Sequence, residues 1–276
     1  MIKQVTNHKI DCDLFNFAYI PAWYERLHEL KELAQPEPWQ YKSYPCSLQN
    51  TETPILERYI QQIFRKQAID YEQASDMKEA DKAFYIRNET ACLHTGLYTP
   101  QFRGIYMLFE KNKKKDTLRD WYFKGFVDDG SEKLKYIPLP QHPMYSQRQW
   151  MPYYNPSWEL RISANHILKE DANVERLPEK IRGLWNLPFL LETAVELVKR
   201  MSYADTSIVA LQIFQGRMQY LLPIHMTDAN IPDVAMAVAP MDGYYVGHTC
   251  LTLPMAYQNA RLLGRPIAGW LKQIVE

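Results

Sequence analysis

The sequence has little glycine: 10 of its 276 residues. Neither G-x-x-x-x-G-K-[ST] nor G-x-G-x-x-G occurs, so the glycine-rich loops that cradle phosphates in P-loop and Rossmann proteins are missing. The motifs H-E-x-x-H of zinc peptidases and G-x-S-x-G of serine hydrolases are missing too. These absences exclude the most familiar nucleotide-binding and hydrolytic classes.

Cysteine and long apolar runs are also scarce. The four cysteines, Cys12, Cys46, Cys92 and Cys250, form no C-x-x-C pair, which excludes a zinc site of the usual spacing. No apolar run approaches the ~18 residues of a membrane helix, and the N-terminus lacks the apolar core of a signal peptide. The sequence therefore predicts a cytoplasmic protein with reduced thiols and no membrane partner, and it assigns no metal ligands. It leaves any cofactor, a metal requirement and the oligomeric state open.

An excess of charge of either sign is missing as well. The 32 lysines and arginines are balanced by 32 aspartates and glutamates, so the formal net charge is +0. This balance excludes binding through a broadly basic surface, but it leaves room for a local basic groove. Apolar residues make up 46% and aromatic residues 13% of the chain, which are proportions of a folded globular protein.

Hydrophobic periodicity divides the chain into helical and strand-forming parts. Apolar residues at helical spacing predict helices at residues 21–35, 53–70, 189–201, 254–263 and 266–275. Stretches rich in aromatic and β-branched residues predict strands at residues 82–87, 90–93, 104–109, 119–126, 158–162, 217–224, 233–239 and 244–253. Since no steady βαβ alternation occurs, the pattern predicts an α+β fold with a mostly antiparallel sheet flanked by helices.

The domain organisation follows from the same pattern. We expect a single domain over residues 1–276, with a helical N-terminal part at 1–75 and a mixed α+β body at 76–276. Residues 128–154 are polar and contain several prolines, so they are predicted to form a loop or lid.

Several stretches together resemble a known family. They are residues 94–100 (HTGLYTP) leading into 105–112 (IYMLFEKN), residues 159–168 (ELRISANHIL), and residues 221–223 (LLP) onward to 251–263 (LTLPMAYQNARLL). The chain resembles, over nearly its whole length, a bacterial domain-of-unknown-function family whose members sometimes accompany cold-shock or LOTUS-type RNA-binding modules. The resemblance implies one domain and an RNA- or nucleotide-related setting. The family often has asparagine in place of His94 and aspartate in place of Pro254, which puts a mechanism that requires His94 in doubt.

The strand predicted at residues 158–162 carries the candidate catalytic group. Alternation places Glu159 and Arg161 together on one face, and His166 follows closely. Arg161 could hold a phosphate or carboxylate in its planar fork, His166 could act as general acid or base, and Glu159 could orient one of them. The alternative is a surface ion pair beside an ordinary histidine.

Two candidate binding segments lie between the predicted strands of the first half. Gly96 permits an unusual backbone angle that would aim Thr95 and nearby amides at a ligand, unless residues 94–97 are an ordinary connecting turn. Lys111 and Asn112 begin a basic run, followed by Arg119 and Trp121. Lysines beside aromatics could track a phosphate backbone while the rings stack on bases, or the run could be a solvated hairpin tip.

The predicted helix at 254–263 carries the last candidate binding residues. Tyr257, Asn259 and Arg261 could face a ligand, with the tyrosine on a base and the arginine on its phosphate. The alternative is structural: Asn259 lies close to an apolar stripe and needs hydrogen-bond partners, and Arg261 ties the helix to a strand.

These candidates support two function hypotheses. The first is a protein that binds RNA or a nucleotide and could also cleave a phosphodiester or phosphoanhydride bond, with Arg161 and Arg261 neutralising phosphate, His166 moving the proton and Glu159 positioning. It requires these residues and Asn259 to converge in one cleft. The alternative is a non-enzymatic protein–protein interaction module of a bacterial stress or defence system. A small-molecule enzyme that uses the same Arg–His face is a third option.

Overall fold

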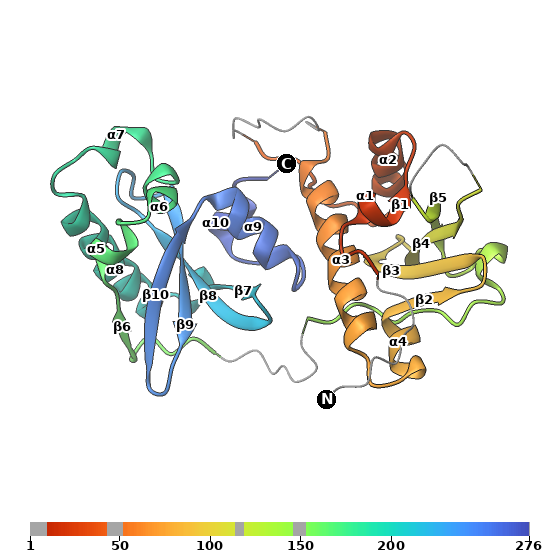
Figure 1. Cartoon of the computed structure of the whole chain (residues 1–276). Coiled ribbons are helices and arrows are strands. Elements are labelled where there is room, and N and C mark those ends of the chain that lie inside the picture. Colours follow the sequence, from red (N-terminus) through yellow and green to blue (C-terminus); the bar gives the residue numbers. More distant parts are fainter. Residues whose placement is uncertain (1–9, 43–51, 114–118, 146–152, 276) are drawn as a thin grey trace. The chain divides into compact units, whose positions relative to one another are not determined.

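The computed structural model describes residues 10–42, 52–113, 119–145 and 153–275. The chain divides into two compact units, one comprising Met1–Gln40 and Cys46–Met144, the other Tyr41–Pro45 and Tyr145–Glu276. Within the described residues, each unit contains one five-stranded sheet and its own helices (Figure 1). No helix among these residues is long and apolar enough to span a membrane.

The first unit begins with helices. They are α1 (Leu14–Phe17), α2 (Trp23–Leu33), α3 (Pro54–Gln73) and α4 (Met77–Ala83), with the two-residue strand β1 (Ala18–Tyr19) after α1. Pro54 opens α3, where its missing N–H costs no hydrogen bond. The face of α3 that carries Ile55, Tyr59, Ile60, Ile63 and Phe64 is buried, as the helical spacing of these residues predicts.

The sheet of the first unit is an antiparallel meander with one added strand. The meander consists of β2 (Phe84–Arg87), β3 (Thr90–Tyr98), β4 (Gly104–Lys111) and β5 (Trp121–Asp128). Strand β1 pairs with β5 in parallel, so the order is β1-β5-β4-β3-β2. A tight group of rings fills the space under α3: Phe17 lies 5.2–5.4 Å from Phe64, Phe84 and Phe109, centre to centre.

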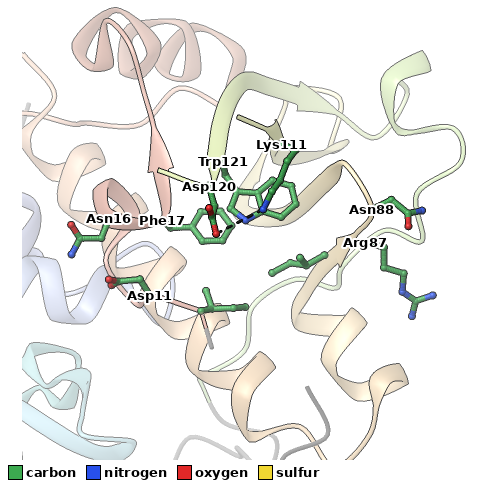
Figure 2. A pocket seen from close by; sticks show the side chains of 10 residues that line it. Asp11, Asn16, Phe17, Arg87, Asn88, Lys111, Asp120 and Trp121 are labelled. Carbon is green, nitrogen blue, oxygen red and sulfur yellow. Dashed lines mark ion pairs between the residues drawn. The ribbon is translucent and has the colours of Figure 1, made fainter. Parts of the chain in front are cut away.

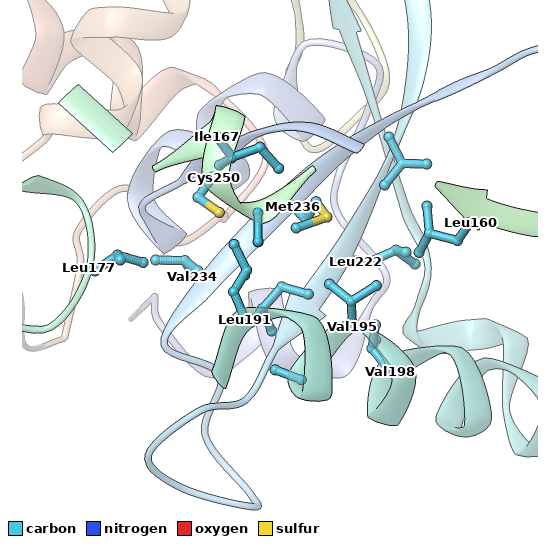
Figure 3. Packing of buried hydrophobic residues seen from close by; sticks show 14 of the residues in the cluster. Leu160, Ile167, Leu177, Leu191, Val195, Val198, Leu222, Val234, Met236 and Cys250 are labelled. Atoms are coloured by element: carbon cyan, nitrogen blue, oxygen red, sulfur yellow. The ribbon is translucent and has the colours of Figure 1, made fainter. Parts of the chain in front are cut away.

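The second unit, like the first, combines a five-stranded sheet with helices. Its elements are β6 (Glu159–Arg161), α5 (Ala164–Ile167), α6 (Asp171–Glu175), α7 (Glu179–Arg182), α8 (Leu187–Ala204), β7 (Ala210–Phe214), β8 (Arg217–Ile224), β9 (Val234–Pro240), β10 (Tyr244–Leu251), α9 (Leu253–Arg261) and α10 (Gly269–Lys272). Leu191, Val195 and Val198 of α8 pack with Leu222 of β8 and Met236 of β9 in the buried core (Figure 3).

The two units share one connectivity. In each, a short strand is followed by helices and then by a four-stranded antiparallel meander, and the short strand pairs in parallel with the last strand of the meander. The order in the second unit, β6-β10-β9-β8-β7, is therefore the order of the first unit with each strand replaced by its counterpart. No internal repeat is detectable in the sequence that would predict this.

The α+β class and the mostly antiparallel pairing are confirmed, with two corrections. The strands form two sheets instead of one, and each sheet includes one parallel pair, because β1 and β6 join the meanders from a distant part of the chain. The helices α1, α4, α5, α6 and α7 and the strands β1 and β7 were not predicted. The prediction of a single domain over residues 1–276 stays a prediction. The predicted loop at 128–154 contains one 3-10 turn, Glu132–Leu134, and residues 146–152 of it lie outside the described residues.

Candidate functional site

Glu159 and Arg161 form a surface ion pair on β6. The Nε of Arg161 donates to Oε2 of Glu159 over 2.7 Å, and both side chains are exposed. This hydrogen bond holds the pKa of Glu159 below its usual range. The guanidinium carbon of Arg161 also lies 4.0 Å from the ring centre of Tyr244 on β10, a cation–π contact. The arrangement matches the ion-pair alternative, and Arg161 already has two partners. The catalytic role of the pair stays a prediction.

The structure does not bring the expected catalytic cleft together. His166 lies exposed on the one-turn helix α5. Asn259 on α9 donates its Nδ2 to Oε1 of Gln212 on β7, over 2.8 Å. Strands β6 and β7 are the two opposite edges of the sheet, four strand spacings or roughly 19 Å apart. Glu159 and Arg161 therefore lie away from the position at which Asn259 is held.

The two remaining candidate residues of α9 are buried instead of facing a ligand. Tyr257 is 3% and Arg261 is 6% exposed. The ring of Tyr257 packs edge-on against Tyr41, 6.4 Å away. The hydrogen-bond partner of Asn259 is the side chain of Gln212 on β7. These placements agree with the structural alternative for this helix, and a nucleotide reaches neither Tyr257 nor Arg261 while α9 is packed in this way.

Residues 94–97 do not connect two strands, because β3 continues through them as an irregularity in its pairing with β4. Gly96 has φ +76 and donates its N–H to Nδ1 of His94 over 2.8 Å. The hydroxyl of Thr95, fully buried, donates to the carbonyl of Ile105 over 2.7 Å. Thr95 and Gly96 thus form hydrogen bonds within the sheet. Gly96 does need its unusual backbone angle, as the sequence predicts.

His94 is buried among aromatic rings. Its ring centre lies 4.8 Å from that of Tyr106, 5.4 Å from that of Tyr98 and 5.3 Å from that of His142. Burial, and next the neighbouring His142, lower the pKa of His94 to about 3. Because Nδ1 accepts the Gly96 amide proton, the neutral ring carries its proton on Nε2.

The neutral burial of His94 predicts that the protein loses stability in mild acid. Below pH 6.5 the unfolded chain takes up a proton here that the folded protein does not, until the pH approaches the folded-state pKa of about 3. The contribution of His94 to the free energy of unfolding is therefore intact above pH 6.5 and falls by up to about 1.4 kcal/mol per pH unit below it. Urea unfolding at pH 7 and pH 5 measures this slope. In H94Q, the part of the pH dependence that comes from His94 should be missing. An unchanged slope in H94Q would contradict the assignment.

Lys111 lines a cavity in the first unit, at the end of β4. We call this cavity, of about 390 Å³, the Trp121 cavity. Its walls are Ile10, Asp11, Asn16, Phe17, Ile86, Arg87, Asn88, Lys111, Asp120 and Trp121. The volume falls in the range of small-molecule sites. Figure 2 shows the Lys111 side chain against Trp121 and Asp120, with Arg87 and Asn88 on one side of the view and Asp11 and Asn16 on the other.

The Trp121 cavity combines a ring with matched charges. The Nζ of Lys111 lies 5.2 Å from the ring centre of Trp121 and 3.8 Å from Oδ2 of Asp120. Phe17 stacks on the same indole, 5.7 Å away and tilted by 13°. Arg87 is paired with Asp81. The pKa of Asp81 is raised, because the effect of burial exceeds the opposite effect of Arg87. Lys111 is consequently the cation least firmly held by a carboxylate in this cavity, because Asp120 is mostly exposed to solvent.

Asn112 closes the hairpin next to this cavity. Its backbone N–H donates to the carbonyl of Asp120 over 2.8 Å, and its Nδ2 donates to the carbonyl of Arg119 over 2.9 Å. Asn112 therefore fixes the start of β5, including Trp121, relative to Lys111. The other lysines of the basic run, apart from Lys113, lie outside the described residues.

The sequence located two members of the Trp121 cavity and missed the others. Lys111 and Trp121 belong to one hairpin, so their proximity was predictable from the turn between them. Asp11, Asn16, Arg87 and Asn88 come from segments distant in sequence that carry no motif. The parallel pairing of β1 with β5 and the stacking of Phe17 on Trp121 bring the first of these segments next to Trp121.

A larger cavity, of about 620 Å³, lies in the second unit. Tyr154 and Tyr220 line it together with the loop between α9 and α10, including Leu263 and Ile267. Aliphatic and aromatic groups make up most of its walls. It offers fewer charged groups than the Trp121 cavity, which we therefore take as the candidate site. Among the described residues, no three His, Cys, Asp or Glu side chains are placed to hold a metal ion.

Comparisons with known proteins place the chain in a family. Searches of curated proteins and of solved structures each found no match. A family model described as a domain of unknown function, DUF3825, matches residues 30–270, which include most of both units. The association with cold-shock or LOTUS-type modules stays a prediction. The chain belongs to the DUF3825 family of domains of unknown function.

Proposed function

We propose that this protein binds RNA or a nucleotide at the Trp121 cavity. The observation that carries the proposal is the position of the Lys111 ammonium, 5.2 Å from the centre of the Trp121 ring, in a cavity also lined by amide and carboxylate side chains. Aromatic rings provide faces for bases, amides and carboxylates can read base edges, and lysine supplies charge for a phosphate.

An exchange at the indole would couple base binding to phosphate binding. Phe17 stacks on the Trp121 ring and the Lys111 ammonium lies over it. A base that packs on the indole face therefore displaces the ammonium, which becomes available to a phosphate. The contact with Asp120 is weak enough to be given up, since its atoms are 3.8 Å apart and Asp120 is exposed.

K111Q tests this proposal. We expect the variant to bind a labelled single-stranded RNA of about ten nucleotides more weakly by about 2- to 10-fold in a fluorescence anisotropy titration. Loss of one phosphate contact should also reduce the slope of log affinity against log salt by about 0.7. K124Q is the matched control, because Lys124 is an exposed lysine of the same hairpin that pairs with Glu110 and does not line the cavity. Equal effects of both variants would contradict the proposal.

The geometry does not favour bond cleavage. It would fall to Glu159, Arg161 and His166 in the second unit, where Arg161 is already engaged by Glu159 and Tyr244. We therefore propose binding, and leave cleavage of a phosphodiester or phosphoanhydride bond as the prediction made from the sequence.

A second candidate function, a protein–protein interaction module, has one observation in its favour. Trp185, which precedes α8, is 85% exposed, and Phe189 in the first turn of α8 is 62% exposed. Large exposed aromatic groups are typical of protein interfaces. Binding through such a surface would weaken less with salt than binding through phosphates, so the salt titration described above separates the two functions.

A further inference from the structure

A second cavity adjoins the Trp121 cavity in the first unit. We call this one, of about 410 Å³, the arginine cavity; its walls are Asp11, Cys12, Asp13, Leu14, Phe15, Arg58, Gln61, Gln62 and Arg65. Asp11 lines both cavities, and Phe15 of one is adjacent in the chain to Asn16 of the other. The short segment around α1 is therefore the wall between the two cavities.

Two arginines that have no ion-pair partner among the described residues line the arginine cavity. Arg58 and Arg65 lie seven residues apart on α3, which is about two helical turns, so they share one side of the helix. Both are exposed, and within the described part of the chain neither guanidinium lies within ion-pair distance of a carboxylate. Arg87 in the neighbouring cavity, by contrast, is already paired with Asp81. Of the described guanidinium groups that line these two cavities, those of Arg58 and Arg65 are therefore the ones that no carboxylate engages.

The acidic residues of the arginine cavity are committed to the backbone. Oδ1 of Asp13 accepts the N–H groups of Phe15 and Asn16, over 2.8 and 3.1 Å, and thereby caps α1. Oδ1 of Asp11 accepts the N–H of Asp13 over 2.8 Å. Their charges offset those of the arginines at a distance, so an anion gains from this cavity only through direct contact with the guanidinium forks.

We infer that the arginine cavity is a phosphate subsite for a strand whose base occupies the Trp121 cavity. This inference rests on the proposed function and specifies its ligand class: a single-stranded oligonucleotide, in preference to a mononucleotide. The Trp121 cavity takes a base, and the arginines take the phosphate of an adjoining nucleotide in their planar forks. Recognition of this kind needs a few arginines at defined positions and does not need a broadly basic surface. It is therefore compatible with a net charge of +0.

The experiment compares R58Q and R65Q with the parent protein on two probes, the labelled RNA of about ten nucleotides and ATP as a competitor. Each variant should bind the RNA about 2- to 10-fold more weakly, with a salt slope reduced by about 0.7, and should bind ATP like the parent. R200Q is the control, because Arg200 is an exposed arginine of the second unit with the same change of charge. Thermal unfolding of the full chain verifies that all variants are folded.

The outcomes separate this inference from the proposed function. If K111Q weakens RNA binding and both arginine variants bind RNA like the parent, the inference is overturned and the Trp121 site stands. If the arginine variants lose ATP affinity as much as RNA affinity, the arginines belong to one mononucleotide site and the inference is overturned as well. If the parent binds neither probe, the proposed function fails and the inference fails with it.

Discussion

Replacing Gly96 with alanine is expected to lower the free energy of unfolding by about 2–5 kcal/mol, from backbone strain and overpacking together. Gly96 has φ +76, where a residue with a side chain is strained. A Cβ at this position would lie 2.4 Å from the hydroxyl oxygen of Tyr59, which is 3% exposed, and 3.3 Å from Pro143. The tyrosine is held on α3 inside the unit, so it has little freedom to move aside.

A second glycine separates the two contributions. Gly216 has φ +74, nearly the angle of Gly96, but no atom lies within 4 Å of a Cβ built there. G216A should therefore carry only the cost of the backbone angle, about 1–2 kcal/mol. Urea unfolding of both variants, monitored by circular dichroism, measures the difference. Equal losses would show that the contact with Tyr59 is relieved at no cost.

The second large effect is expected from L191A in the core of the second unit. Leu191 is fully buried among the side chains drawn in Figure 3, and its truncation should lower the free energy of unfolding by about 2–5 kcal/mol through the cavity left behind. L197A is the matched control on the same helix, because Leu197 is 43% exposed. Its effect should stay within about 0.5 kcal/mol. Similar losses in the two variants would contradict the packing described for α8.

The same pair of variants addresses the domain organisation. Each unit has its own sheet and its own buried core, and L191A alters only the second. In differential scanning calorimetry, one transition that shifts as a whole identifies a single cooperative domain, as predicted from the sequence. A shift confined to one of two transitions identifies two units that unfold separately.

The sequence predicted most strands of the meanders, for a physical reason. Strands β4, β5, β8, β9 and β10 are rich in apolar and aromatic residues and neighbour each other in the chain, so local pattern and turn signals suffice. Strands β1 and β6 have two and three residues and pair with partners far along the chain. No local pattern encodes such a pairing, so neither parallel pair was predicted.

The placement of the candidate residues in the second unit was predictable to the extent that it is local. The alternation of Glu159, Leu160 and Arg161 correctly predicted two exposed side chains around a buried one. It could not reveal that Arg161 lies over Tyr244, because that contact depends on the pairing of β6 with β10. Similarly, the need of Asn259 for a polar partner was predictable, while the identity of that partner, Gln212, follows from how α9 packs on β7.

The shared connectivity of the two units defines equivalent positions in a chain without a detectable repeat. Trp121 is the first residue of β5 and is paired with β1, and Tyr244 is the first residue of β10 and is paired with β6. A cation lies over each ring, Lys111 over the first and Arg161 over the second. Trp121 and Tyr244, 123 positions apart in the sequence, thus occupy equivalent positions in their sheets. Strand order is consequently the basis on which the two halves of this chain can be aligned.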